Sequence, residues 1–293
     1  MKVKAICPAS CGELLQGMIG KEEKLISYPI QFFSTVTVEE KKEPKIDTKW
    51  KKASLAMYET LRFFGESNKI GDQLEITVQS AIPIGKGMAS STADVAATVT
   101  ATAEILGRKL TPDQLATICV QVEPTDSTIF PSLTLFDHLS GVREVSFDWN
   151  PGLEILVLES NNILDTQEFR KNDYDNLRIA NQAQVEKAYQ LFQRGISEKK
   201  PSLLGEAAIL SALANQAILP KEKLEKIIEL SLRRGCHGVN VAHSGTVIGI
   251  LFEKGQGDMK ALIEEFVKNS IMDEYPKVYL TKMIEGGTKI IKD

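Results

Sequence analysis

The chain has 293 residues, of which 43% are hydrophobic and 25% are charged, and its formal net charge is −4. A chain of this length buries a full core and is long enough for two domains. Its slight negative charge predicts no general attraction to nucleic acid or to acidic lipid, so we expect neither as a partner.

The first residues, "MKVKAICPASCGE", contain no apolar run long enough for a signal peptide or a membrane span, so we expect a cytoplasmic protein. The four cysteines form no CxxC pair and are expected to be free thiols in a reducing compartment. Three histidines, His138, His237 and His243, are too dispersed in the sequence to predict a metal site. The sequence carries no mark of the oligomeric state.

The first half of the chain alternates predicted strands and helices. Strands are expected over "KVKAI" and "FFSTVTVEE", and apolar residues at helical spacing predict a helix over residues 49–65. The segment "QLEITVQSAIP" alternates apolar and polar residues, which favours a half-buried strand that Pro83 ends. A row of small residues then predicts a closely packed helix over residues 93–106, with Gly107 placed to stop it.

The segment "TPDQLATICVQVEP" is the clearest helix of the sequence. Thr111 can cap it, and Pro112 suits its first position. Pro124 disfavours helical angles at the residue before it. Glu123 is therefore predicted to lie where this helix ends.

A second unit is predicted to begin near residue 150. The apolar run "EILVLES" favours a strand covered on both faces, and helices are expected around residues 173–195, 202–218 and 221–234. Two strands around a His-Ser-Gly turn, a short helix and a last strand at "KVYLTKMI" complete an order that resembles a split βαβ sandwich. We predict an α+β protein with domains over residues 1–150 and 151–293.

The stretch "PIGKGMASST" joins a predicted strand to a predicted helix. Gly85 and Gly87 allow unusual backbone angles and close approach of a ligand, and the free N–H groups of a helix start suit an anion. Ser90, Ser91 and Thr92 could cap the helix, bind phosphate oxygens or meet a metal ion. A plain turn before a serine-capped helix is the alternative. The stretch matches neither the P-loop nor the dinucleotide-binding pattern.

Three stretches together carry a resemblance to the GHMP kinases: "CPASCGELLQG", "PIGKGMASST" and "GCHGVNVAHSGTVIG". The phosphate loop of that superfamily has the form Pro-x-Gly-x-Gly-Leu-x-Ser-Ser, and the chain has Met88 in place of the leucine. The stretches "EKLISYPI" and "VEPTDSTIFPSLTLFDHLSG" make the chain similar to the L-threonine kinase branch. The resemblance implies a two-domain fold, in which the N-terminal domain is like one from a small-subunit ribosomal protein and the C-terminal domain is ferredoxin-like.

The resemblance also implies a nucleotide site for ATP and Mg²⁺. Ser91, with Ser90 as the alternative, would touch the Mg²⁺ ion, and Glu123 would be the second metal ligand. Lys86 would reach a phosphate or remain solvated. The residues that would surround the ATP phosphates are Pro83, Ile84, Gly85, Lys86, Gly87, Met88, Ala89, Ser90, Ser91 and Thr92.

Asp126 is implied near the acceptor hydroxyl, either as a general base or as a group that orients the hydroxyl or the ammonium of the substrate. The base role is open because Ala9 or Ser10 stands where several family members carry lysine or arginine. The other residues implied at the substrate are Ser10, Cys11, Gly12, Glu13, Ser244, Gly245 and Thr246, with Glu13 as a partner of the ammonium. Cys11 could instead be a small buried residue, and Ser244 with Gly245 a hairpin turn.

The implied function is that of a kinase which phosphorylates L-threonine and serves the aminopropanol arm of cobalamin synthesis. Two alternatives remain open. One is another small-molecule kinase on the same scaffold, such as a homoserine kinase. The other is a sensor that binds the ligands without chemistry, although such a protein has no need of Ser90, Ser91, Glu123 and Asp126 together.

Overall fold

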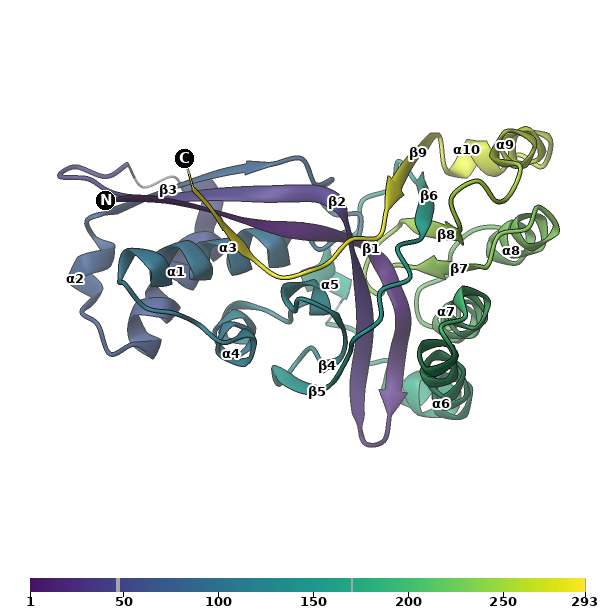
Figure 1. Ribbon diagram of the computed structural model, residues 1–293, viewed down its shortest axis with the longest axis horizontal. Coiled ribbons are helices and arrows are strands. Elements are labelled where there is room, and N and C mark those ends of the chain that lie inside the picture. Colours follow the sequence, from purple (N-terminus) through teal and green to yellow (C-terminus); the bar gives the residue numbers. More distant parts are fainter. Residues whose placement is uncertain (46–47, 170, 293) are drawn as a thin grey trace.

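Two long antiparallel strands, β1 (Lys2–Ile19) and β2 (Glu22–Glu40), run through the whole fold (Figure 1). The structure is a computed structural model and describes residues 1–45, 48–169 and 171–292. The middle of β1 is buried without interruption from residue 7 to residue 16, because other elements cover both of its faces. Irregular register after Pro8 and after Ser10 marks bulges, which bend a strand.

The other strands join these two in one sheet. They span Leu74–Ser80 (β3), Leu133–Asp137 (β4), Val142–Phe147 (β5), Glu154–Glu159 (β6), Gly238–Val241 (β7), Ile248–Phe252 (β8), Lys277–Lys282 (β9) and Lys289–Ile291 (β10). The strand order is β5-β4-β2-β1-β7-β8-β6-β9, with β3 paired to β2 and β10 paired to β1. All of these described pairings are antiparallel.

Helices cover the two halves of this sheet. They span Lys51–Phe63 (α1), Asn68–Gly71 (α2), Ser90–Ile105 (α3), Pro112–Val122 (α4), Thr166–Phe169 (α5), Asp175–Glu198 (α6), Pro201–Asn215 (α7), Leu224–Arg233 (α8), Met259–Lys268 (α9) and Ile271–Glu274 (α10). Short 3-10 helices lie at Thr48–Trp50 and Ser127–Ile129. Figure 1 shows α1, α3 and α4 beside one half of β1 and β2, and α6 to α9 in a row beside the other strands.

Helix α3 is central to the first half. Ten of its 16 residues are buried, and it packs on β1, β2 and α1. Alanine, threonine and valine suit this position because small side chains let neighbouring elements approach on every side. Helix α4 packs beside it and begins with a capping box, in which Thr111 and Gln114 bond each other's backbone N–H groups.

Buried hydrophobic side chains form two clusters. The larger cluster lies between β1, β2, α1, α3 and α4 and extends to α6 and α7. The second lies between β6, β7 and β8 and the helices α8 and α9. The single sheet connects the two, and the division into domains at residue 150 stays a prediction.

The elements expected from the sequence are present, and the α+β class agrees with the sheet and its helices. Strands β1 and β2 are longer than expected, so the stretch from Cys7 to Gly17 lies inside a strand instead of following one. Three strands, β4, β5 and β10, had no counterpart in the sequence analysis. All four cysteines are free and buried. In the described residues we find no helix with the length and apolar character that crossing a membrane would require.

A close backbone contact between α7 and β7 gives a test of this packing. A Cβ atom added to Gly205 would lie 2.1 Å from the carbonyl oxygen of His237. Because that neighbour is backbone, the substitution Gly205→Ala is expected to lower the free energy of unfolding by about 2 kcal/mol or more. Urea denaturation followed by circular dichroism measures it. Ser202→Ala, on the exposed side of α7, is the control, and equal stability of both variants would contradict the packing.

Candidate active site

The glycine-rich loop between β3 and α3 uses left-handed backbone conformations at three residues. Gly85 and Gly87 have φ of 71° and 77°, and Ala89, at the N-cap of α3, has φ of 57°. Glycine adopts such angles without strain. No side chain caps α3, so capping is not the role of the serine hydroxyls among the alternatives considered. The first amides of a helix lack intrahelical acceptors and point outward, which suits an anion.

A cavity of about 680 Å³ lies over this loop. The start of α1, the first turn of α3, the end of α4 and residues 163–165 form its other walls. Nine of the ten residues predicted to surround the ATP phosphates line it: Pro83, Ile84, Gly85, Gly87, Met88, Ala89, Ser90, Ser91 and Thr92. Glu123, Asp126 and Ser244 line it as well. One open cavity therefore holds most of the phosphate loop together with Glu123 and Asp126.

Lys86 is the loop residue that does not line this cavity in the described structure. Its ammonium donates hydrogen bonds to the carbonyl oxygens of Ser160 (2.8 Å), Asn161 (3.2 Å) and Asn162 (2.7 Å). The residue is 6% exposed, and burial lowers the pKa of its ammonium. The solvated alternative is therefore wrong. Lys86 fastens the loop to the chain after β6, and a contact between Lys86 and phosphate stays a prediction.

A lysine bridges Glu123, at the C-cap of α4, and Ser91, in the first turn of α3. The ammonium of Lys52, from α1, lies 2.5 Å from Glu123 Oε2 and 3.1 Å from Ser91 Oγ. Sequence reasoning missed Lys52, because "KWKK" has the composition of a solvated helix start and carries no signal for a partner 71 residues away.

The two predicted metal ligands thus share one cation. The side chain of Glu123 is 9% exposed, and its Oε1 atom has no hydrogen-bond partner among the described residues. A buried carboxylate oxygen without a partner is costly. Mg²⁺ favours one or two carboxylates together with phosphate and hydroxyl oxygens. The donor set of Ser91 Oγ and Glu123 therefore fits a Mg²⁺ ion.

Asp94, one turn into α3, is a further carboxylate on the cavity wall that sequence reasoning missed. It accepts a hydrogen bond from the Ser34 hydroxyl. Burial raises the pKa of Asp94 to about 6, although the bond from Ser34 opposes the rise, and the charge of Glu123 adds to it. An ionisable group held away from its ordinary pKa in a cleft is typical of functional sites.

Asp126 lies on the same wall, directly before the second 3-10 helix. Its Oδ2 accepts a hydrogen bond from the Thr92 hydroxyl at 3.1 Å, which links it to the first turn of α3. The charge of Asp126 also helps to raise the pKa of Glu13, after the larger effect of burial. Asp126 and Glu13 are therefore close enough to interact electrostatically, and their roles at the substrate stay a prediction.

The segment of β1 from Ser10 to Glu13 lies behind the loop. Ser10 N–H donates to the Met88 carbonyl at 3.1 Å, and the buried Ser10 hydroxyl has no partner among the described residues. The Cys11 thiol is fully buried, and burial raises its pKa to about 12. For Cys11 the structure matches the small buried residue of the alternative interpretation. Gly12 lies against the backbone of Val241, where a Cβ atom would be 2.6 Å from its carbonyl carbon.

The turn after β7 holds the phosphate loop from the other side. Thr246 and Val247 donate their N–H groups to the Lys86 carbonyl at 2.9 and 3.1 Å. Gly245 approaches Gly87 so closely that a Cβ atom on it would lie 2.2 Å from the Gly87 Cα atom. In the described structure Ser244 reaches the cavity, whereas Gly245 and Thr246 support the loop without lining that space.

Two of the histidines, expected to be dispersed, lie together. The rings of His138 and His243 are 5.2 Å apart, and both approach Glu23. Glu23 Oε1 is 2.9 Å from His243 Nε2 and 3.0 Å from Arg178 Nε. Burial would raise the pKa of Glu23, but His243, His138 and Arg178 together lower it to about 2. Because the Arg178 guanidinium already neutralises Glu23 Oε1, we assign the cluster to an ion-pair network that holds His243 in place.

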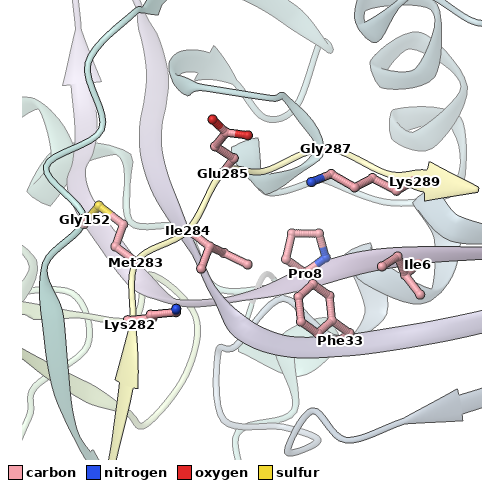
Figure 2. A pocket seen from close by; sticks show the side chains of 10 residues that line it. All are labelled: Ile6, Pro8, Phe33, Gly152, Lys282, Met283, Ile284, Glu285, Gly287 and Lys289. Carbon is pink, nitrogen blue, oxygen red and sulfur yellow. The ribbon is translucent and has the colours of Figure 1, made fainter.

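A second hollow, of about 500 Å³, lies where the C-terminal segment crosses β1 and β2 (Figure 2). Its walls include Ile6, Pro8, Phe33 and Ile284, with the charged side chains of Lys282, Glu285 and Lys289 around them. Among the described residues that line it, Glu285 is the one carboxylate, and no loop with left-handed glycines precedes a helix there. The cavity over the β3–α3 loop is therefore the candidate active site.

Comparisons with known proteins agree with this geometry. Residues 53–130, which include the phosphate loop and Glu123, match the family described as GHMP kinases N terminal domain. The chain is 40% identical over 287 residues to the L-threonine kinase of Salmonella typhimurium, covering 98% of this chain and 95% of that relative. The chain belongs to the L-threonine kinase family of the GHMP kinases. It is therefore an ATP-dependent kinase by family, and the predicted resemblance is confirmed.

Other relatives of this kinase agree. The L-threonine kinase of Citrobacter freundii is 39% identical, with 98% of this chain and 99% of the relative covered. The crystal structure of homoserine kinase from Cytophaga hutchinsonii matches with a TM-score of 0.72 at 15% identity, covering 99% of this chain and 97% of that one. The GHMP kinase-like fold expected from the sequence is thus confirmed.

The pKa of Asp94 predicts a pH-dependent effect on the stability of this kinase. The carboxyl binds its proton more tightly in the folded protein, so stability falls as the pH rises from about 4 to about 6, and the full penalty is present above that range. Asp94→Asn removes the penalty and keeps an acceptor for Ser34. The free energy of unfolding should rise by about 2 kcal/mol at neutral pH, with almost no change near pH 4.

Urea denaturation of Asp94→Asn and of the wild type at the two pH values measures this difference. Asp148→Asn, at an exposed position, is the control and should change stability at neither pH. A loss of stability at neutral pH in Asp94→Asn would show that the carboxylate is held by favourable contacts instead.

Proposed function

We propose that the protein transfers the γ-phosphoryl group of ATP to the hydroxyl of L-threonine, giving O-phospho-L-threonine and ADP. The observation that carries this proposal is the cavity over the β3–α3 loop, in which a helix N-terminus faces Glu123 and Asp126. Relatives that are named L-threonine kinase and match almost the whole chain support the choice of acceptor. We place the reaction in the cytoplasm, where its product would feed the aminopropanol arm of cobalamin synthesis.

The loop from Pro83 to Thr92 is proposed to bind the polyphosphate. Gly85 and Gly87 keep side chains out of the way, and the first amides of α3 supply donors and the positive end of the helix dipole. The bonds from Thr246 and Val247 to the Lys86 carbonyl keep the loop in place before a nucleotide arrives. Such preorganised donors are the main source of catalysis in phosphoryl transfer.

Ser91 and Glu123 are proposed to hold Mg²⁺, with Ser90 as the alternative hydroxyl. The unpartnered Oε1 atom of Glu123 and the Ser91 hydroxyl point to this role, since both are oxygen donors on one cavity wall. Bound there, the ion would neutralise phosphate charge.

Asp126 is proposed to meet the acceptor hydroxyl. In the reaction the threonine oxygen bonds to the γ-phosphorus, the bond from that phosphorus to the bridging oxygen breaks, and the hydroxyl proton leaves. Asp126 is fixed by Thr92, so it can orient the hydroxyl or accept its proton. Glu13 is proposed as the partner of the substrate ammonium, with Ser10, Cys11, Gly12 and the turn at Ser244, Gly245 and Thr246 around the substrate.

The choice of acceptor is tested by supplying ATP and Mg²⁺ with threonine, serine, homoserine or mevalonate and measuring ADP release. Threonine is expected to give the highest kcat/KM, by about tenfold or more over each competitor. A preference for homoserine would overturn the acceptor. Binding of ATP and threonine without ADP release would make the protein a sensor.

The metal ligands are tested by Glu123→Gln and Ser91→Ala. Each variant removes one proposed ligand, so turnover with threonine should fall by about 100-fold or more while the fold stays intact. Initial rates of ADP release give the effect, and circular dichroism checks the fold. Thr117→Ala, on the exposed side of α4, is a control of similar size. Near-normal rates in both active-site variants would mean that other residues hold the ion.

A further inference from the structure

Lys52 occupies an unusual place for a surface lysine. Its ammonium contacts Glu123 Oε2 and Ser91 Oγ, the two groups proposed above to hold Mg²⁺. The side chain of Lys52 is 37% exposed, whereas that of Glu123 is 9% exposed. The ammonium therefore occupies one oxygen of a carboxylate that lines the cavity. A divalent ion held by Glu123 and Ser91 Oγ would lie within a few ångströms of the ammonium, and two cations repel strongly at that distance.

The start of α1 concentrates further positive charge at this cavity. Lys51 and Lys52 are its first two residues, no acidic residue stands in its first turn, and Lys49 precedes it. Lysines at a helix N-terminus act against the helix dipole and lower stability slightly. Among the residues that the structure describes, the N-cap residue Trp50 gives this helix no side-chain cap either. This helix start lowers stability and brings lysines to the cavity. Such a concentration of positive charge is suited to binding an anion.

The bond between Lys52 and Glu123 also differs from a saturated structural ion pair. Glu123 Oε1 finds no hydrogen-bond partner within the described residues, although the side chain is buried. A pair that served stability alone would satisfy both oxygens, because an unsatisfied buried oxygen is costly. One oxygen of Glu123 is thus held by a lysine on a flexible stem, and the other is left for a ligand.

We propose that Lys52 stands in for the divalent ion in the nucleotide-free protein and moves to the polyphosphate when nucleotide and metal bind together. This role rests on the proposed function, because it takes Ser91 and Glu123 as the metal ligands. Lysine is suited to it as a point charge with three donors and a flexible stem. The exchange makes tight metal binding depend on the nucleotide, since the phosphates give the ammonium an anion to bind once it leaves Glu123.

The test removes the ammonium and measures the metal and the nucleotide separately. Lys52→Met keeps much of the apolar stem, so Mn²⁺ alone, followed by electron paramagnetic resonance, should bind about tenfold more tightly than to the wild type. ATP with Mg²⁺, followed by calorimetry, should bind about tenfold more weakly. A residue with a merely structural role would weaken both or neither, so the opposite signs identify the exchange.

Lys51→Met is the matched control. Lys51 is adjacent and lines the same cavity, but in the described structure it bonds to neither Ser91 nor Glu123. Its removal takes away the same charge and should leave Mn²⁺ affinity within about twofold of the wild type. Lys52→Arg, which keeps the charge, should retain weak Mn²⁺ binding and so separates loss of charge from a packing defect.

Unchanged or weaker Mn²⁺ binding in Lys52→Met, with the fold intact by circular dichroism, would overturn the proposal. Unchanged affinity for ATP with Mg²⁺ in this variant would overturn the proposed movement of the Lys52 ammonium to the phosphates. Neither measurement needs an acceptor. A protein that shows the opposite changes in affinity but does not phosphorylate threonine would therefore refute the proposed acceptor and leave the role of Lys52 standing.

Discussion

The need to balance charge around Glu123 determines the arrangement of the candidate site. This carboxylate is buried at the end of α4, beside a loop that is suited to a polyphosphate of the same sign. Two like charges cannot share such a space without cations between them. The fold supplies positive charge from three directions: the N-terminus of α3, the N-terminus of α1, and the ammonium of Lys52. Asp94 shows the cost of carboxylates in this space, because burial raises its pKa to about 6 and the charge of Glu123 adds to the rise.

Segments far apart in the sequence hold the phosphate loop in its conformation. The Lys86 ammonium is fastened to the chain after β6, and the Lys86 carbonyl accepts two N–H groups from the turn before β8. Glycine is required where that turn meets the loop, since the Gly245 and Gly87 backbones lie in direct contact. The first half of the chain thus carries the loop, and the second half fixes its geometry. A rigid loop keeps its amides aimed at one place, which is the condition for electrostatic stabilisation without reorganisation.

The sequence predicted best what short segments determine. The capping box at Thr111, the position of Glu123 at a helix end and the helix after the glycine loop each depend on a few neighbouring residues, and the structure agrees with them. Strands β4, β5 and β10 were missed because each is short and is defined by its pairing partner. Lys52 and Lys86 were missed or misjudged for a related reason. Their partners lie 39 to 76 residues away, and a lysine in a charged segment has the same local pattern whether it is solvated or buried.

Glu13, proposed above to bind the substrate ammonium, follows the same rule of charge balance. Burial raises the pKa of Glu13, and the charge of Asp126 raises it further, whereas the N–H of His243, which donates to Glu13 Oε2, and the charge of Lys221 oppose the rise. His243 is itself held by Glu23 and Arg178, so the position of Glu13 is set by a network that extends away from the cavity. Carboxylates that interact in this way repel each other unless a positive group lies beside them. Lys221 supplies part of that charge to Glu13, although burial lowers the pKa of its ammonium. The ammonium of an amino acid would add to that charge and a plain alcohol would not, which gives a physical reason why a site of this composition would favour threonine over an uncharged acceptor.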